Sequence, residues 1–307
     1  MFIQRIAERI EKRPNGWAFD FLGTDSKLHT LQSLWTLVRS DVWYVVGTPE
    51  VNPWIDAVAR LIRKRTVFHW IGSDIPLVRR TPRLTRRWKR PEIAHLTEAP
   101  WTLHELHAMG ISASVAALPL RLGEGAIPPL PATFTLLFYI PTFRGEFYGM
   151  STYRRLVERF APDDVEFIIV GGGAFDAPPG AKVRNLGWTD SLQTVYAQAT
   201  ALVRMTERDG LSLMVLEALS HGRYVFWPQP FENVIAVREY DVLERGITGL
   251  LELHRAGQLK ANLEAAEFVR TTYCDAETVD TLARHWEYGA TAERAAPAVS
   301  PRAAERG

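Results

Sequence analysis

Apolar residues along this chain follow two spacings in turn, one typical of strands and one typical of helices. Short apolar runs predict strands at 17–22, 42–46, 67–71, 93–99 and 115–120. Helical spacing predicts helices between them, one ending near residue 38 and others at 53–64 and 100–109. Such alternation is typical of a parallel sheet covered by helices on both faces, so the pattern predicts an α/β fold.

The same alternation resumes in the second half of the chain. Strands are predicted at 134–140, 165–170, 201–203 and 224–227, and helices at 192–198, 211–219, 259–270 and 276–288. Residues 123–132 are rich in Gly and Pro, which is typical of a hinge between domains. We therefore predict a first domain at 1–122 and a second at 133–288. Residues 289–307 hold almost no large apolar side chains and are predicted to be a disordered tail.

The first domain opens on a predicted amphipathic helix, at 1–13, instead of a strand. A doubly wound domain normally begins with a strand and a Gly-rich phosphate turn, and that first strand is missing here. Two explanations stay open. Either the natural chain starts upstream of Met1, or the sheet is shortened and has a different central strand.

Composition narrows the class of protein. The chain has 307 residues, 47% of them hydrophobic and 23% charged, as in ordinary soluble proteins of two domains. It has neither an apolar run of 18 residues nor a signal peptide, which predicts a cytoplasmic protein. The single cysteine, Cys274, allows no internal disulfide and no cysteine-based metal site.

Two acids bracket the start of the predicted helix at 211–219. Asp209 stands just before the helix and Glu217 about two turns into it. The backbone N–H groups of Gly210 to Ser212 would face the same space, and a helix N-terminus attracts phosphate. Carboxylates and amides in this order suit a phosphorylated sugar. The alternative is an ordinary N-cap by Asp209 and a solvated Glu217, although the neighbours of Glu217 are nearly all apolar.

The stretch from Asp209 to Gly222 resembles the signature of retaining GT-B glycosyltransferases of the glycogen-synthase-like, family-four kind. The resemblance implies two Rossmann-like domains and a donor site for a nucleotide-diphosphate sugar in the cleft, on the second-domain side. It assigns the ribose of the nucleotide to Glu217 and the donor sugar to Asp209. The first acid is usually Glu in that family, so the sugar that Asp209 would contact stays open. As in other GT-B proteins, the helix at 276–288 could cross back to the first domain.

The resemblance extends to other donor contacts. Arg144 matches an Arg that commonly contacts the diphosphate, whereas the Lys expected shortly after it is replaced by Tyr148 or a neighbour. We therefore expect Arg204 to supply a phosphate contact, the alternative being a salt bridge to a nearby acid. Trp188 is expected to stack on the base unless it is buried. The expected donor-binding residues are Arg144, Arg204, Gly210, Leu211, Ser212, Trp188 and Gly171, the last of which opens a glycine turn.

Polar residues also follow the predicted strand at 67–71. His69, Ser73 and Asp74 lie at its carboxyl end, where parallel sheets bind ligands. The segment resembles the strand end that faces the donor sugar and acceptor in the same glycosyltransferases. We expect His69 on the catalytic side and Ser73 and Asp74 on the acceptor or sugar side. The alternative is a helix cap by Ser73 or Asp74 and a packed histidine.

Basic residues concentrate between Arg79 and Arg90, although the formal net charge of the chain is only +1. Proline, leucine and tryptophan side chains are interleaved with them. This run could contact an anionic membrane or an anionic acceptor, or it could be a solvated face. It has no base-reading element, so we expect no nucleic-acid partner.

The sequence as a whole predicts a retaining glycosyltransferase that moves a sugar from a nucleotide-diphosphate sugar to a glycan, lipid-linked or small-molecule acceptor. The resemblance implies that the departing phosphate takes the acceptor proton and that no metal or other cofactor is needed. No Asp-x-Asp pair with metal-like spacing occurs in the sequence. Two alternatives stay open, a nucleotide-sugar epimerase of the same fold and a catalytically silent nucleotide-sugar binder. A nicotinamide dehydrogenase is disfavoured because no G-x-G-x-x-G follows a strand.

Overall fold

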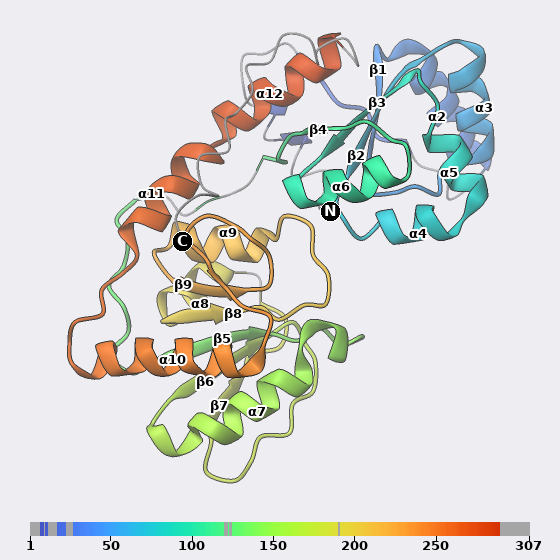
Figure 1. Ribbon diagram of the computed structural model, residues 1–307. Helices are drawn as coiled ribbons and strands as arrows, with labels where there is room; N and C mark the ends of the chain where they lie inside the picture. The colour runs from blue at the N-terminus through green and yellow to red at the C-terminus, as the bar shows by residue number, and fades with distance from the viewer. Residues whose placement is uncertain are drawn as a thin grey trace. The chain divides into compact units, whose positions relative to one another are not determined.

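The computed structural model describes residues 7–8, 10–11, 17–22, 27–119, 122, 125–189 and 191–288. The chain divides into two compact units, shown in Figure 1. The first unit is Met1–Pro119 with Ala276–Gly307, and the second is Leu120–Asp275. Helix α12 (Asp275–Tyr288) follows the second unit in sequence but returns to the first. The predicted division had assigned this helix to the second domain, and the predicted tail at 289–307 lies outside the described residues.

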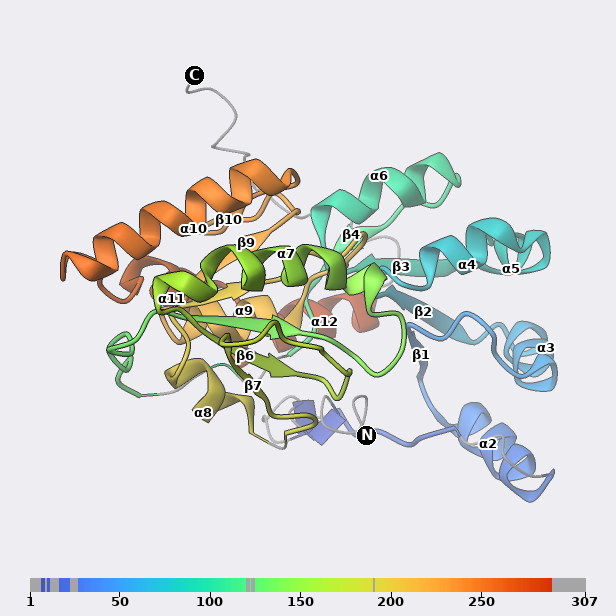
Figure 2. The ribbon, with the colours of Figure 1, turned by 90° about the horizontal axis from the view of Figure 1, so that it is seen from below.

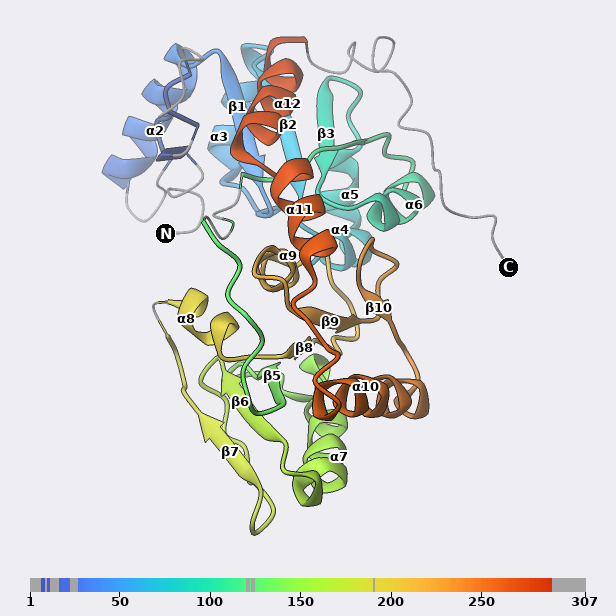
Figure 3. The same ribbon diagram turned by 90° about the vertical axis from the view of Figure 1, so that its left-hand side faces the viewer.

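The first unit is built on a four-stranded parallel sheet of order β1-β2-β3-β4. Its strands are β1 (Val42–Val46), β2 (Arg65–Trp70), β3 (Ile93–Thr97) and β4 (Ser114–Val115). Its helices before α12 are α2 (Lys27–Arg39), α3 (Pro53–Leu61), α4 (Ile75–Arg80), α5 (Pro82–Trp88) and α6 (Pro100–Ala108). Side chains of these five helices form the core on one face of the sheet. On the other face α12 packs Val279, Leu282 and Trp286 against β1 and β2, which it crosses in Figure 3.

The second unit has a six-stranded parallel sheet of order β10-β9-β8-β5-β6-β7. Its strands are β5 (Thr135–Tyr139), β6 (Glu166–Val170), β7 (Lys182–Asn185), β8 (Ala201–Val203), β9 (Tyr224–Trp227) and β10 (Ile235–Ala236). Its helices are α7 (Met150–Phe160), α8 (Leu192–Ala197), α9 (Leu213–Ser220), α10 (Tyr240–Arg255) and α11 (Leu263–Thr272), with 3-10 turns η1 (Glu146–Tyr148) and η2 (Ala161–Asp163). Figure 2 shows α7 and α10 on one side of this sheet and α8 on the other. Two parallel sheets covered by helices confirm the predicted α/β class of two Rossmann-like units.

The strand predicted at 17–22 is wrong, because these residues pair with no strand. Two of their apolar side chains, Trp17 and Phe19, pack on a helix instead, whereas Phe21 is half exposed. The rings of Trp17 and Phe19 lie 5.1 and 5.6 Å from the ring of Trp286 in α12. Trp17 and Phe19 are thus partly buried by packing on one aromatic residue, without a hydrogen-bonded ladder. Most of the helix predicted at 1–13 lies outside the described residues, although residues 7, 8, 10 and 11 are helical.

Two further predictions differ in extent from the structure. The strand predicted at 115–120 is reduced to β4, which pairs with β3 only through Ser114 and Val115. Proline at 119 has no N–H group for a ladder, which disfavours a longer strand there. Helices α4, α5, α7 and α10 were not predicted. The basic charges had obscured the helical spacing of Ile75, Val78, Leu84 and Trp88, the buried residues of α4 and α5.

Within the described part of the chain, no helix combines the length and the apolar character needed to cross a bilayer.

Candidate functional site

Three loops of the second unit meet at the carboxyl edge of its sheet, because β5, β6 and β8 are parallel neighbours. The loop after β5 is joined to the loop after β8 where the N–H of Glu207 donates to the Phe147 carbonyl at 3.0 Å. It is joined to the loop after β6 where the N–H of Gly173 donates to the Ile140 carbonyl at 2.9 Å. The predicted donor-binding residues on these loops therefore lie along one edge of one sheet.

Arg204 and Asp209 form an ion pair at this edge. Nε of Arg204 donates to Oδ2 of Asp209 at 2.5 Å, and the two side chains are only 11% and 15% exposed. Burial lowers the pKa of the Arg204 guanidinium, but the charge and the hydrogen bond of Asp209 outweigh it, so the pKa is raised overall. The guanidinium of Arg204 therefore stays charged at neutral pH. The salt bridge that we gave as the alternative for Arg204 is thus present. Its acid is Asp209, the first of the two acids in the motif.

Tyrosine rings surround the guanidinium of Arg204. Its Cζ lies 5.7 Å from the ring centroid of Tyr139 and 5.8 Å from that of Tyr148. These two rings meet edge to face at 5.3 Å. Tyr148 occupies the position where the resemblance expects a lysine, so a cation lies beside that position even though the residue there is neutral. The hydroxyl of Tyr153 accepts a hydrogen bond from the N–H of Met205 at 3.1 Å and supports the same loop from beneath.

Arg144 lies on the surface of the loop after β5. Its backbone has a positive φ of 65°, which is uncommon for a residue with a side chain. The guanidinium Cζ stacks 4.2 Å from the centroid of the Phe147 ring. Among the described residues no carboxylate lies within ion-pair distance of Arg144. The loop after β5 therefore presents an exposed cation.

Helix α9 begins later than predicted and is capped by a different residue. Its N-cap is Ser212, whose carbonyl accepts the first helical hydrogen bonds from Val215 and Leu216 at 3.1 and 3.2 Å. The amides of Leu213 and Met214 therefore belong to the first turn, which has no intrahelical acceptors for them. Asp209 is not the N-cap. Gly210, Leu211 and Ser212 are buried between the ion pair and this helix start.

Glu217 lies in α9 with its carboxylate held by a tyrosine that the sequence did not single out. The hydroxyl of Tyr196, in α8, donates to Oε2 of Glu217 at 2.8 Å. Burial raises the pKa of Glu217, and the hydrogen bond from Tyr196 opposes the rise. His221 stacks against Tyr196 at 5.2 Å between ring centroids, and its Nδ1 lies 2.8 Å from the Glu217 carbonyl. Glu217 is thus a partly buried, oriented acid and not a solvated one.

The glycine turn after β6 is required by a close approach of two backbones. Gly171 has a φ of 107°, and a Cβ atom there would lie 2.7 Å from the Ile140 carbonyl oxygen. A Cβ on Gly172 would lie 2.7 Å from Nε1 of Trp188. Trp188 itself is 73% exposed, so its indole is not the buried tryptophan of the alternative. The turn and the exposed ring lie side by side at the same edge of the sheet.

The residues predicted in the first unit have a different environment. His69 is fully buried, its Nδ1 is hydrogen-bonded to the Tyr44 hydroxyl at 2.6 Å, and burial lowers its pKa to about 3. Asp74 is also buried. Its Oδ2 accepts from the N–H of Ile71 at 3.2 Å, and burial raises its pKa to about 6. Only Ser73 is exposed, so His69 fits the packed-histidine alternative.

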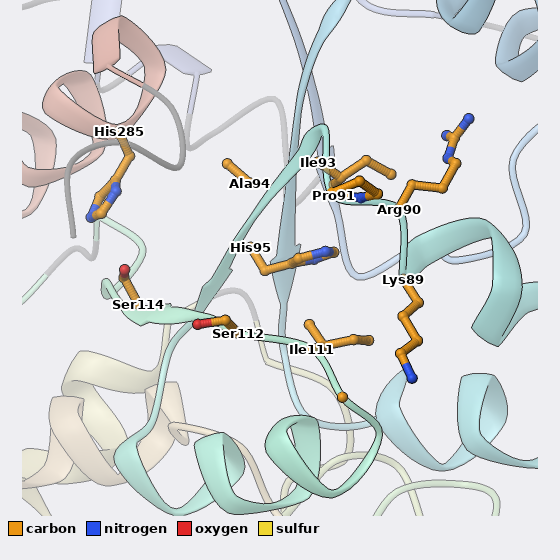
Figure 4. Close-up of a pocket in the computed structure, with 11 residues that line it drawn as sticks. Lys89, Arg90, Pro91, Ile93, Ala94, His95, Ile111, Ser112, Ser114 and His285 are labelled. Atoms are coloured by element: carbon orange, nitrogen blue, oxygen red, sulfur yellow. The ribbon is translucent and has the colours of Figure 1, made fainter.

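Part of the basic run has a structural role. Arg87 Nε and Arg90 Nη2 bind the two oxygens of Asp56 in α3 at 3.1 and 2.9 Å. The end of the run borders a cavity of about 270 Å³ in the first unit, drawn in Figure 4. Its lining consists of Lys89, Arg90, Pro91, Ile93, Ala94, His95, Gly110, Ile111, Ser112, Ser114 and His285. Apart from Lys89 and Arg90, this lining holds none of the residues singled out from the sequence.

No group of three or more His, Cys, Asp or Glu side chains in the described ranges is placed to hold a metal ion. The metal-independent chemistry implied by the resemblance stays a prediction.

Solved structures with the same fold exist, although the sequence matches no protein-family model and no curated protein. The sucrose-phosphate synthase of Thermosynechococcus elongatus covers 93% of this chain and 92% of its own, with a TM-score of 0.63 at 12% identity. HepE of Anabaena, solved in complex with UDP, covers 85% of this chain and 82% of its own, with a TM-score of 0.64 at 11% identity. A mutant of S. aureus TarM, solved with UDP among its ligands, covers 72% of this chain, with a TM-score of 0.54 at 11% identity.

The chain spans half the length of the TarM chain that it matches. At such low identity these matches define the fold alone, which is the GT-B fold with two Rossmann-like units. This confirms the fold class that the acidic motif had led us to expect.

Proposed function

We propose that this chain is a retaining glycosyltransferase whose nucleotide-diphosphate sugar binds at the carboxyl edge of the sheet in the second unit. The observation that carries the proposal is the buried Arg204–Asp209 ion pair beside the N-terminus of α9, with Glu217 inside the same helix. A cation, a helix N-terminus and an oriented acid in this order match the phosphates and the ribose of a nucleotide.

Each part of the donor has a proposed partner. The diphosphate is held by the first-turn amides of α9 together with Arg204 and the exposed Arg144. Glu217, oriented by Tyr196, accepts hydrogen bonds from ribose hydroxyls. The exposed ring of Trp188 stacks on the base. Asp209 contacts hydroxyls of the donor sugar, which requires it to share its carboxylate between the sugar and Arg204.

The proposed reaction keeps the configuration of the sugar. The bond between the anomeric carbon and the diphosphate oxygen breaks, and the acceptor oxygen forms its bond on the same face. The acceptor proton passes to the departing phosphate, so the enzyme needs no separate base. Arg204 and the amides of α9 stabilise the negative charge that develops on the leaving group. Neither His69 nor Asp74 is needed as a proton carrier in this scheme.

UDP is the first nucleotide to test, because HepE and TarM were solved with UDP. We would measure the thermal stability of the full chain with UDP, GDP and ADP. A ligand that binds only the folded state at about a hundred times its dissociation constant adds roughly 2.7 kcal/mol, which a melting curve detects. We expect stabilisation by one nucleotide, lost in Glu217→Ala and retained in Glu252→Ala, a matched change on the exposed surface of α10.

Stabilisation of Glu217→Ala equal to that of the wild type would overturn the assignment of the ribose to Glu217. No stabilisation by any nucleotide would overturn the donor site. Turnover then separates the remaining alternatives. A silent binder, which the neutral Tyr148 at the lysine position favours, would be stabilised by nucleotide without releasing it from a nucleotide sugar. An epimerase would convert the donor sugar with no acceptor present.

A further inference from the structure

Helix α2 turns apolar side chains outward. Leu28, Leu31, Trp35 and Val38 are spaced by three and four residues, so they share one side of the helix, and each is at least half exposed. The opposite side supplies Leu37 to the core. A surface helix normally places polar residues on its outer side. The outer side of α2 is therefore unusual and requires an explanation.

Helix α3 repeats the feature next to α2. Trp54 and Leu61, two turns apart, are 71% and 82% exposed, while Ile55 and Ala59 face the core. The two helices pack together on the same face of the sheet, where both contribute to one core cluster. They lie side by side in Figures 1 and 2. We call Leu28, Leu31, Trp35, Val38, Trp54 and Leu61 the α2–α3 apolar face.

The stretch of chain that begins in α3 carries almost entirely positive charge. From Arg60 to Arg90 the chain has eleven lysines and arginines and one acid, Asp74, which is buried. Helix α5 is tied to α3 by the ion pairs of Arg87 and Arg90 with Asp56. Arg39 in the last turn of α2 and Arg60 in the last turn of α3 lie on the two helices that carry the apolar face. The exposed basic residues between Arg60 and Arg90 that form no ion pair among the described residues are Arg60, Arg63, Arg65, Arg79, Arg80, Arg83, Arg86 and Lys89.

We propose that the α2–α3 apolar face docks on an anionic membrane surface. Its tryptophans and leucines would enter the boundary between headgroups and acyl chains, and the adjoining arginines would contact lipid phosphates. Trp35 illustrates the pairing, because the guanidinium of Arg39 lies 5.6 Å from its ring. A second copy of the chain is a poorer occupant, because a two-fold contact would bring the two basic sets together.

The basic run between Arg79 and Arg90 then has two roles. Arg87 and Arg90 are engaged by Asp56 and serve to hold α5 on α3. The remaining arginines attract the surface, and α2 and α3 supply the apolar contacts that the run lacks. The inference does not depend on the proposed glycosyl transfer, because the two surfaces belong to different units of the chain.

Vesicle flotation of the full chain tests the proposal. One set of vesicles is phosphatidylcholine alone, and the other is an equal mixture with phosphatidylglycerol. We expect binding to the mixed vesicles, weaker binding to the neutral ones, and a loss of about tenfold or more in Leu31→Glu with Leu61→Glu. Arg79→Gln with Arg83→Gln should reduce binding to the mixed vesicles alone. Val242→Glu with Leu253→Glu, at exposed apolar positions of α10, is the matched control and should bind like the wild type.

Melting curves establish that each variant is folded before its binding is compared. No binding of the wild type to the mixed vesicles would overturn the proposal. So would equal binding by the α2–α3 variant and the α10 control. Sedimentation velocity without lipid tests whether a second copy of the chain occupies the face instead. A dimer of the wild type that becomes monomeric in Leu31→Glu with Leu61→Glu would assign the face to a second copy and overturn the proposal.

Discussion

Each unit places charged or titratable side chains just beyond a buried parallel strand, and the two sets differ in how burial is compensated. After β8 in the second unit, Arg204 and Asp209 are buried together as a cation and an anion. Near the end of β2 in the first unit, His69 and Asp74 are buried without a partner of opposite charge among the described residues. The pKa of Arg204 is raised and that group stays charged, whereas burial moves the pKa values of His69 and Asp74 toward their neutral forms.

Position at a strand end therefore does not by itself make a binding site. A ligand with phosphates needs charge that remains when water is excluded, and a buried charge persists when a counter-charge offsets its desolvation. The second unit meets this condition. The first unit has the same arrangement of strand and loop but a histidine and a carboxylic acid that burial favours in their uncharged forms.

Removing the charge of Arg204 in the second unit should have the largest effect on the free energy of unfolding. In Arg204→Met the mostly buried carboxylate of Asp209 loses the guanidinium that forms its ion pair, so we expect the free energy of unfolding to fall by about 3 kcal/mol. Nucleotide stabilisation should be lost as well. Urea denaturation with and without UDP measures both. Arg159→Met, which breaks surface ion pairs with Asp163 and Glu244, is the control and should cost less than about 1 kcal/mol. Equal losses in the two variants would contradict the comparison.

Neutralising Asp74 in the first unit should have an intermediate effect on the free energy of unfolding, and it should raise that free energy instead of lowering it. The folded pKa of Asp74 is about 6 and its reference value is 3.8, so the folded state binds a proton that the unfolded state releases between these values. Stability therefore falls as pH rises through this window. Asp74→Asn removes the penalty and should raise the free energy of unfolding by up to about 3 kcal/mol at pH 7.

Urea denaturation between pH 4 and pH 7 checks this prediction. The advantage of Asp74→Asn should shrink to about 0.5 kcal/mol near pH 4, because the folded wild-type acid is then protonated and the unfolded acid, with its reference pKa of 3.8, is partly protonated. The pKa of His69 is lowered to about 3 from 6.5, so the unfolded state binds the extra proton and stability falls as pH drops below 6.5. With the opposing Asp74 removed, the variant should lose stability more steeply on acidification than the wild type. Destabilisation of Asp74→Asn at pH 7 would contradict the contrast between the two units.

The smallest effect concerns the orientation of Glu217. Tyr196→Phe removes the hydrogen bond at 2.8 Å and leaves the carboxylate in place. We expect the affinity for nucleotide to fall about fivefold, as for the loss of one hydrogen bond of about 1 kcal/mol, and the pKa of Glu217 to rise. Calorimetric titration with UDP measures the affinity. Tyr224→Phe breaks the hydrogen bond of its hydroxyl to the Lys260 carbonyl and should leave the affinity unchanged. An unchanged affinity in Tyr196→Phe would remove Tyr196 from the site.

Particular elements show how much of the fold the sequence pattern predicted correctly. The apolar run at 42–46 coincides with β1, and the run at 201–203 with β8, because both strands are buried and flanked by turns. The alternation at 17–22 led to the wrong prediction of a strand, since Trp17 and Phe19 pack on Trp286, more than 260 positions away in sequence. Local alternation reports which side chains are buried, and it does not report what covers them.

The candidate site likewise has features that the sequence predicted and features that depend on the tertiary structure. The sequence by itself determined the two parallel sheets, the acidic motif and its place between β8 and α9, because these follow from local spacing and turn residues. Only the tertiary structure decided that Asp209 pairs with Arg204, that Tyr196 orients Glu217, and that His69 and Asp74 are buried. These outcomes depend on burial and on partners that the fold brings together, and both set the charge of a side chain after the chain has folded.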